Sequence, residues 1–202
     1  MPRPRPDPQP AEGIESLLEA DLRPAPGILF AGAGAVAIMS FASLAWPQAL
    51  ASTWLGALMI AGAEVDARTF MLPDTVTWGA LLSGILAAAV LDPFAPGASA
   101  VDAALRAAGT AAVLLAVRLG YARLRQREGL GLGDVKLAAA IGAWLPLDAI
   151  PLCFAVAAGA ALILVLLAHW RGARIEAATR LPFGAFLCPA LWLVFYMTLW
   201  SG

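Results

Sequence analysis

Residues 61–82 read AGAEVDARTFMLPDTVTWGALL, where one long apolar run ends and the next begins after a short polar gap. The same alternation of apolar run and short gap extends over most of the chain. An apolar helix needs roughly 17–25 residues to cross a bilayer. Six runs have about that length, and they cover residues 27–46, 49–65, 75–91, 102–120, 149–169 and 183–200.

A seventh apolar run, residues 134–146, is shorter than a spanning helix. A short helix is accommodated when a bundle shields it or when it borders a water-filled cavity. The composition agrees with a membrane environment, because 61% of the residues are hydrophobic, only 13% are charged and the mean hydropathy is +0.79. The sequence therefore predicts an all-α protein, a polytopic transmembrane helix bundle of about seven helices.

The first 26 residues differ from the rest, because they are rich in proline and mixed in charge. They predict a disordered cytoplasmic tail over residues 1–26, followed by a single membrane domain over residues 27–202. The charges offer no basic surface for nucleic acid. Cys153 and Cys188 lie in separate apolar runs with no CxxC pair, and His169 is the only histidine, so we expect neither a disulfide nor a metal site, and no cofactor.

Basic residues predict the orientation, because loops that carry lysine and arginine near helix ends stay in the cytoplasm. In every second gap we find basic residues, namely Arg68, Arg118, Arg123, Arg125, Arg127, Arg171, Arg174 and Arg180. The opposite gaps contain acids but no basic residue, namely Asp92, Asp102 and Asp148. In a bacterial inner membrane this pattern predicts a cytoplasmic N-terminus and a periplasmic C-terminus.

Two aspartates stand near the ends of apolar runs, where an ionisable group is costly and calls for a reason. Asp66 lies where the second run ends, and an ordinary polar helix terminus would explain it equally well. Asp134 follows Gly129, Gly131 and Gly133. Either Asp134 caps the helix that follows, or the glycines leave room for an extended peptide beside a reactive carboxylate.

The predicted topology places Asp66 and Asp134 at the same depth, on helices that can pack side by side. Peptide hydrolysis without a metal or a nucleophilic side chain needs such a pair. Two close carboxylates cannot both ionise, so one stays protonated to polarise the carbonyl while the other activates water. The two residues are therefore candidate catalytic groups, and the sequence leaves open which one is the base.

Three motifs resemble the prepilin peptidase (type IV leader peptidase) family of membrane aspartic proteases with a GxGD motif. The first is Asp66 with LPDTVT at residues 72–77, the second is GLGDVK at residues 131–136, and the third is PFGAFL at residues 182–187. The resemblance implies that Asp66 and Asp134 form the catalytic dyad. It also implies that the substrates are prepilin or pseudopilin precursors, which lose a short basic leader at the cytoplasmic membrane face.

Further expectations concern residues around this dyad. The candidate substrate-binding residues are Gly131, Gly133, Lys136 and Arg68, and Asp74 is expected to cap the helix that follows Pro73. Ala185 replaces a proline common in the third motif, a change expected to alter a helix start without touching the dyad.

The chain resembles the short, leader-cleaving members of the family, such as those of tight-adherence pilus systems. Longer members have an extra cytoplasmic domain with paired CxxC motifs and methylate the new N-terminus. This sequence contains no CxxC pair, so the resemblance gives no basis for N-methyltransferase activity.

Two other functions fit the same composition. A small ion or proton-coupled transporter would use membrane acids as a relay, although the centres of the predicted helices contain few polar groups. An inactive assembly protein of a pilus or secretion system would keep the fold without the chemistry. In each case membrane lipids are expected partners.

Overall fold

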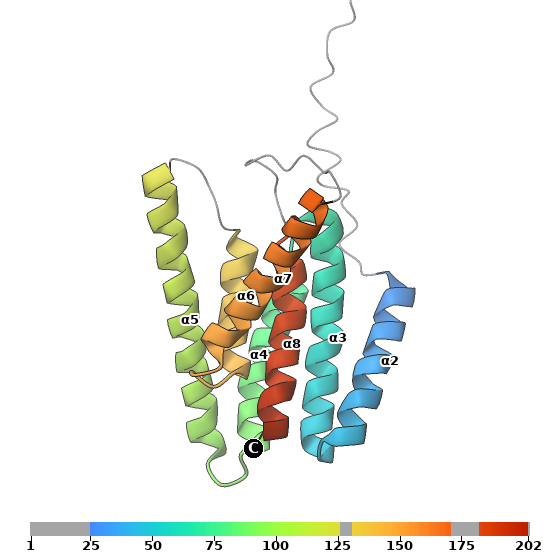
Figure 1. Ribbon diagram of the computed structural model, residues 1–202. Coiled ribbons are helices and arrows are strands. Elements are labelled where there is room, and N and C mark those ends of the chain that lie inside the picture. The colour runs from blue at the N-terminus through green and yellow to red at the C-terminus, as the bar shows by residue number, and fades with distance from the viewer. Residues whose placement is uncertain (1–24, 126–130, 171–181, 202) are drawn as a thin grey trace, which may run out of the picture.

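The computed structural model describes residues 25–125, 131–170 and 182–201, and these ranges form seven helices and no strand (Figure 1). The helices are α2 (Pro26–Ser43), α3 (Trp46–Thr69), α4 (Asp74–Leu91), α5 (Pro96–Arg125), α6 (Leu132–Trp144), α7 (Ile150–Trp170) and α8 (Gly184–Ser201). Each predicted apolar run corresponds to one of them. The prediction of an all-α bundle is therefore confirmed, while most of the predicted N-terminal tail, residues 1–24, lies outside the described residues.

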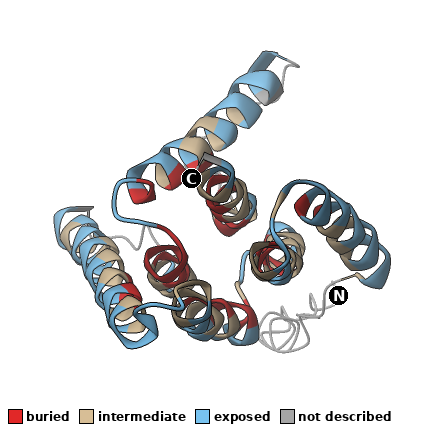
Figure 2. Ribbon diagram, turned by 90° about the horizontal axis from the view of Figure 1, so that it is seen from below, coloured by how far each residue is buried: buried red, intermediate tan, exposed pale blue. Residues whose placement is uncertain are grey.

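Four of the described helices, α2, α4, α5 and α7, are long and apolar enough to cross a membrane. Their outer faces carry large apolar side chains, such as Phe30 and Leu105, which are 75% and 66% exposed. In the view of Figure 2 the exposed residues lie along α2, α5 and α7, at the outside of the bundle. Hydrocarbon tails are the natural solvent for such a surface.

The core of the bundle is formed mainly by α3, α6 and α8. Leu55 and Met59 of α3 are fully buried, as are Leu187 and Leu191 of α8. The Trp144 ring of α6 packs edge-on against Phe195 of α8, with ring centroids 4.9 Å apart. The central place of these three helices matters for the site, because each contributes a residue to it.

Helix α6 is too short to span a bilayer alone, and the bundle shields it as predicted. Its residues from Leu137 to Trp144 are almost all buried, and it packs against α4 and α5. The Trp144 indole nitrogen donates to the Ala80 carbonyl of α4 over 2.7 Å. In Figure 1, α6 stops well above the lower end of the bundle, so its last carbonyls lie at membrane depth.

Arg106 of α5 supplies donors to those carbonyls, a role that the sequence analysis missed. Its Nε donates to the Gly142 and Leu145 carbonyls over 3.2 and 3.0 Å. Its guanidinium also pairs with Asp102 one turn earlier on the same helix. The last carbonyls of a helix have no partner within it, and none comes from hydrocarbon, so this arginine completes the end of α6.

Several charged residues that were predicted to lie in gaps belong to helices instead. Asp102, Arg118 and Arg123 lie within α5, and Arg68 lies in the last turn of α3. The apolar runs mark the hydrocarbon-facing part of a helix, but good helix formers such as arginine extend it further. The boundaries of α3 and α5 therefore lie outside their apolar runs.

Asp92 closes the turn between α4 and α5. Its carboxylate accepts the hydroxyl of Ser99 over 2.5 Å and the backbone N–H groups of Phe94 and Ala95. These donors, with Ser99 the strongest, hold the pKa of Asp92 below its ordinary value. Asp92 thus has a local structural role at the end of the bundle opposite the site.

The prediction that Asp74 caps α4 is wrong. Pro73 occupies the N-cap position and no side chain caps the helix there, while Asp74 is the first helical residue. Its carboxylate instead pairs with Lys136 of α6 over 2.5 Å. An acid in the first turn still favours the helix through its dipole, and the ion pair links the starts of α4 and α6.

Candidate active site

Asp66 lies in the last turn of α3 and is only 5% exposed. The chain leaves this helix at Phe70, which has a left-handed backbone conformation with φ of 56° and donates its N–H to the Asp66 carbonyl over 2.8 Å. Oδ2 of Asp66 accepts the backbone N–H of Ala185, at the start of α8, over 2.8 Å. Two segments that are distant in the sequence therefore meet at this carboxylate.

Asp134 is the third residue of α6 and is half-buried. Asp134 was expected to precede and cap this helix, whereas it lies within the first turn, and its Oδ2 accepts the N–H of the N-cap residue Gly131 over 3.2 Å. This contact points the carboxylate back over the start of α6. This hydrogen bond is compatible with a catalytic role, because the other carboxylate oxygen of Asp134 can still accept a proton or a hydrogen bond.

Three glycines, one from each central helix, surround the side chain of Leu72. An added Cβ would lie 3.5 Å from Leu72 at Gly62 of α3, 3.2 Å at Gly133 of α6 and 2.9 Å at Gly184 of α8. We call these residues the glycine socket. It lets the loop between α3 and α4 join the ends of the three helices, and thereby holds the helices that carry Asp66 and Asp134 together.

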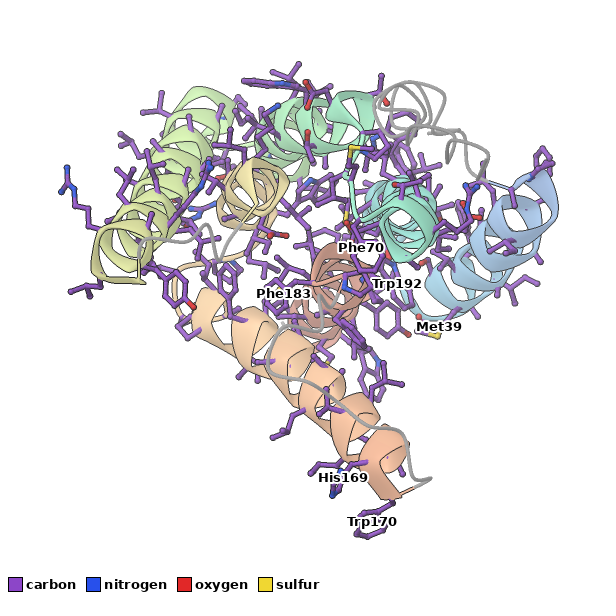
Figure 3. All side chains as sticks on the ribbon, turned by 90° about the horizontal axis from the view of Figure 1, so that it is seen from above. Met39, Phe70, His169, Trp170, Phe183 and Trp192 are labelled. Atoms are coloured by element: carbon purple, nitrogen blue, oxygen red, sulfur yellow. The ribbon has the colours of Figure 1, made fainter. Side chains whose placement is uncertain are left out.

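The two aspartates are close enough for their charges to interact. Cys188 of α8, which is fully buried with a free thiol, lies near both of them. We call Asp66 and Asp134 the aspartate pair. It lies at the upper end of the bundle in Figure 1, and Figure 3 looks down on this end, where Phe70 and Phe183 are labelled.

The four candidate substrate-binding residues occupy different positions around the aspartate pair. Gly131 is exposed and precedes α6, whereas the space beside Gly133 is filled by Leu72. Arg68 pairs with Glu64 over 2.7 Å, and Lys136 pairs with Asp74. The room expected beside the GxGD glycines is therefore taken up by Leu72 at Gly133, and a Cβ added at the exposed Gly131 would lie 3.3 Å from Oδ2 of Asp134.

The expectation that Ala185 leaves the dyad untouched is wrong, because its N–H is the donor to Asp66. The error has a physical source. The prediction concerned the side chain at this position, whereas the group that contacts Asp66 is the backbone N–H, which every residue except proline has. The contact joins residues 119 positions apart, and no sequence periodicity reports it.

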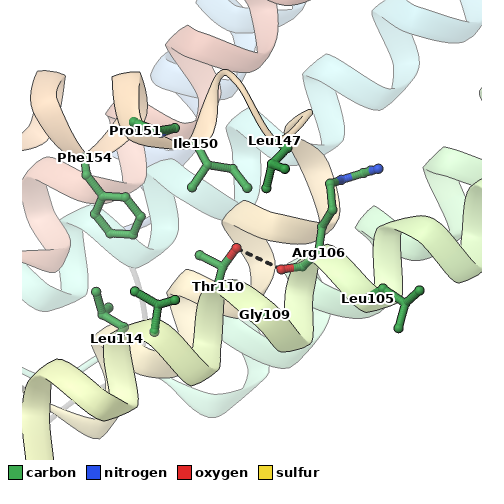
Figure 4. Close-up of a pocket in the computed structure, with 10 residues that line it drawn as sticks. Leu105, Arg106, Gly109, Thr110, Leu114, Leu147, Ile150, Pro151 and Phe154 are labelled. Atoms are coloured by element: carbon green, nitrogen blue, oxygen red, sulfur yellow. Dashed lines mark hydrogen bonds between the residues drawn. The ribbon is translucent and has the colours of Figure 1, made fainter.

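A separate apolar cavity of about 610 Å³ lies between α5 and α7 (Figure 4). Its lining includes Leu105, Val113 and Phe154, and the Thr110 hydroxyl in its wall donates to the Arg106 carbonyl over 2.8 Å. Neither member of the aspartate pair lines it. The cavity has the character of a lipid-facing groove and offers no acid–base chemistry.

Among the residues that the structure describes, no group of three histidine, cysteine, aspartate or glutamate side chains could hold a metal ion. His169 ends α7 beside the exposed Trp170, far from the aspartate pair in Figure 3. The arrangement that remains is a buried and a half-buried carboxylate with backbone donors. Such a pair can bind and activate a water molecule.

The fold and the site define a multi-pass membrane protein with two interacting carboxylates at one end of its helix bundle. The chain belongs to the type IV leader peptidase family, whose sequence model matches residues 53–166. The match includes Asp66, the glycine before Asp134 and Asp134 itself, and ends before the third motif. No solved structure gives a significant match to this chain.

Known relatives agree with this assignment. The chain is 39% identical over 139 residues to a prepilin leader peptidase/N-methyltransferase of Burkholderia pseudomallei, and 38% identical over 156 residues to one of Dickeya chrysanthemi. The matched segments are 69% and 72% of this chain, but only 43% and 51% of those longer proteins. The leader peptidase HopD of Escherichia coli is 37% identical, over 68% of this chain and 86% of its own length.

Proposed function

We propose that this chain is an aspartic endopeptidase that removes the leader from type IV prepilin-like or pseudopilin precursors at the inner membrane. Family membership and the printed activities of its relatives support the substrate class. The chain also matches 86% of the length of HopD, which is a leader peptidase. The 202-residue sequence contains no CxxC pair, so the proposal covers leader removal and not N-methylation.

One observation carries the proposal. Asp66 and Asp134 belong to different helices and are distant in sequence, yet the glycine socket around Leu72 brings the two helix ends that carry them together. Burying a carboxylate costs several kcal/mol unless donors or chemistry compensate for it. In a bundle without a catalytic role, apolar side chains at these helix ends would give a more stable fold than buried carboxylates do.

The chemistry follows from the properties of two close carboxyl groups. One, as the carboxylate, takes a proton from a water molecule, whose oxygen then bonds to the carbonyl carbon of the scissile peptide. The other, as the carboxylic acid, gives its proton to the carbonyl oxygen. When the C–N bond breaks, the first group returns a proton to the leaving amine and the second regains its own, so the pair ends as it began.

The site belongs, in this proposal, at the cytoplasmic face of the membrane. Arg68 and Lys136 lie at the same end of the bundle as the aspartate pair, and basic residues mark the cytoplasmic side. A prepilin leader precedes a hydrophobic helix, so its scissile bond reaches the membrane surface at this depth. Lipids cover the apolar outer faces of α2, α5 and α7.

The decisive experiment co-expresses the chain with a candidate prepilin and measures the mass of the pilin N-terminus. Asp66→Asn and Asp134→Asn are each expected to lower cleavage by about 10²–10⁴-fold, because each removes one acid–base partner. Both proteins should still accumulate in the membrane. The same mass shows whether a methyl group is added, and none is expected.

A matched control is Asp148→Asn, an identical change at an exposed position at the other end of α6. It should cleave like the unaltered chain. Full cleavage by either Asp66→Asn or Asp134→Asn would refute the two-aspartate mechanism. Absence of cleavage by the unaltered chain with every prepilin offered would remove the proposed activity.

A further inference from the structure

The backbone N–H of Ala185 provides a donor that is aimed at one member of the aspartate pair. It lies 2.8 Å from Oδ2 of Asp66, and the amide of Gly184 also interacts with this carboxylate. A hydrogen bond from an N–H to an ionised carboxylate is stronger than one to the neutral acid. These contacts therefore favour Asp66 in its charged form.

Asp134 has a weaker donor. The N–H of Gly131 reaches its Oδ2 over 3.2 Å, a length at the weak limit for this type of hydrogen bond. Helix dipoles do not separate the two residues clearly. The start of α6 favours a charge on Asp134, while Asp66 gains from the start of α8 and loses from the end of α3. Burial disfavours the charged form of both carboxyl groups, so the direct donors decide which of the two carries the charge more readily.

Other ionisable groups around Asp66 do not reverse this order. Helix α2, which packs on α3, contains none. Glu64 and Arg68 on the same helix as Asp66 pair with each other. From the other packed elements the facing groups are Asp134 and Lys136 of α6, Asp74 of α4 and Cys188 of α8, and of these Lys136 and Asp74 form an ion pair.

We propose that the Ala185 N–H is a positioning group that keeps Asp66 as the charged member of the pair, so that Asp66 is the general base and Asp134 the proton-donating acid. This assignment rests on the proposed function and specifies it. Asp66 takes the proton from water while the water oxygen bonds to the peptide carbonyl carbon. Asp134 gives its proton to the carbonyl oxygen, and Asp66 then protonates the leaving amine as the C–N bond breaks.

Ala185→Pro tests the assignment, because proline removes this N–H, which also donates more weakly to the Pro182 carbonyl over 3.2 Å. The second position of a helix accepts proline in this chain, since α3 begins with Trp46 and Pro47. The readout is kcat/KM for leader removal from a purified prepilin as a function of pH. We expect the acid limb to move up by about one to two pH units, the shift for loss of one hydrogen bond to a charged group, while the alkaline limb stays in place.

Two variants complete the design. Ala185→Ser keeps the N–H and should keep both limbs where the unaltered chain has them. Gly131→Pro removes the donor to Asp134 instead, at a residue whose φ of −69° proline adopts readily. Because the two carboxyl groups titrate as a pair, this variant should move the alkaline limb upward and leave the acid limb in place.

The results separate this inference from the proposed function. An unmoved acid limb in a folded Ala185→Pro protein, or an acid limb that moves in Gly131→Pro, overturns the assignment while leaving the peptidase intact. Should Ala185→Pro fail to accumulate, Gly131→Pro alone decides by the limb that it moves. Loss of the proposed function would appear earlier, as unaltered cleavage by Asp66→Asn.

Discussion

Gly184 stands closer to Asp66 than any other residue type could. A Cβ at this position would lie 2.8 Å from Oδ2 and 2.9 Å from Cγ of Asp66, and also 2.9 Å from Leu72. Real Cβ atoms do not approach other atoms so closely, so the carboxylate or the helix would have to shift. The glycine is thus required by its neighbours, and its backbone freedom is secondary.

Gly184→Ala should lower leader cleavage by about 10- to 100-fold, because a displacement of Asp66 of the order of 1 Å spoils its alignment with the water and the peptide. The measurement is kcat/KM with a purified prepilin. Gly159→Ala is the matched control, since nothing lies within 4 Å of the Cβ it adds. Equal activity of the two variants would show that Asp66 tolerates displacement.

Sequence reasoning predicted Asp66 and Asp134 but not their donors. The aspartates stand out because carboxylates are rare near apolar runs. The donors are backbone groups of Ala185 and Gly131, and any residue except proline would supply them. Asp74 was misread for a related reason, because its partner Lys136 lies on another helix and only the fold brings the two together.

The short helix α6 accounts for an arginine, Arg106, inside an apolar run. A helix that ends at membrane depth leaves carbonyls without water, and Arg106 of α5 reaches two of them. The signal in the sequence was an arginine four residues after Asp102 within a predicted span. Its meaning depended on knowing that α6 stops short and that its end packs on α5.

Arg106→Leu should destabilise the protein by about 1–3 kcal/mol, because it leaves the Gly142 and Leu145 carbonyls without this donor. Thermal unfolding in detergent measures the change. Asp102→Asn is the control, because it weakens only a pair with an exposed acid and should cost about 0–1 kcal/mol. Equal losses in the two variants would show that the ion pair, and not the helix end, is what matters.

The number and order of the described helices followed from the sequence. Each apolar run became a helix, because in hydrocarbon a helix is the way for a continuous segment to satisfy its own backbone. The tilt of α7 and its separation from α5 in Figure 1 did not follow, since hydropathy contains no information on which helices touch. The packing of Leu72 in the glycine socket belongs to the same class of unpredictable contacts.

The proposed orientation can be tested by fusing a reporter enzyme that is active only outside the cytoplasm. If the seven described helices run alternately up and down, a fusion after Gly202 should be active, and one inserted between α5 and α6 should be silent. The expected difference follows from the basic residues that mark one side. The reverse pattern would put the aspartate pair at the periplasmic face and contradict the proposed site of cleavage.

The position of the Asp66 donor on α8 has a consequence for biosynthesis. Helix α3 leaves the ribosome long before α8, so during translation Asp66 enters the membrane without the Ala185 amide. On the proposed assignment, Asp66 of an unfinished chain lacks the donor that favours its charged form and gains it only when α8 docks. An unfinished chain should therefore cut other precursors less readily at low pH than a chain in which α8 has docked.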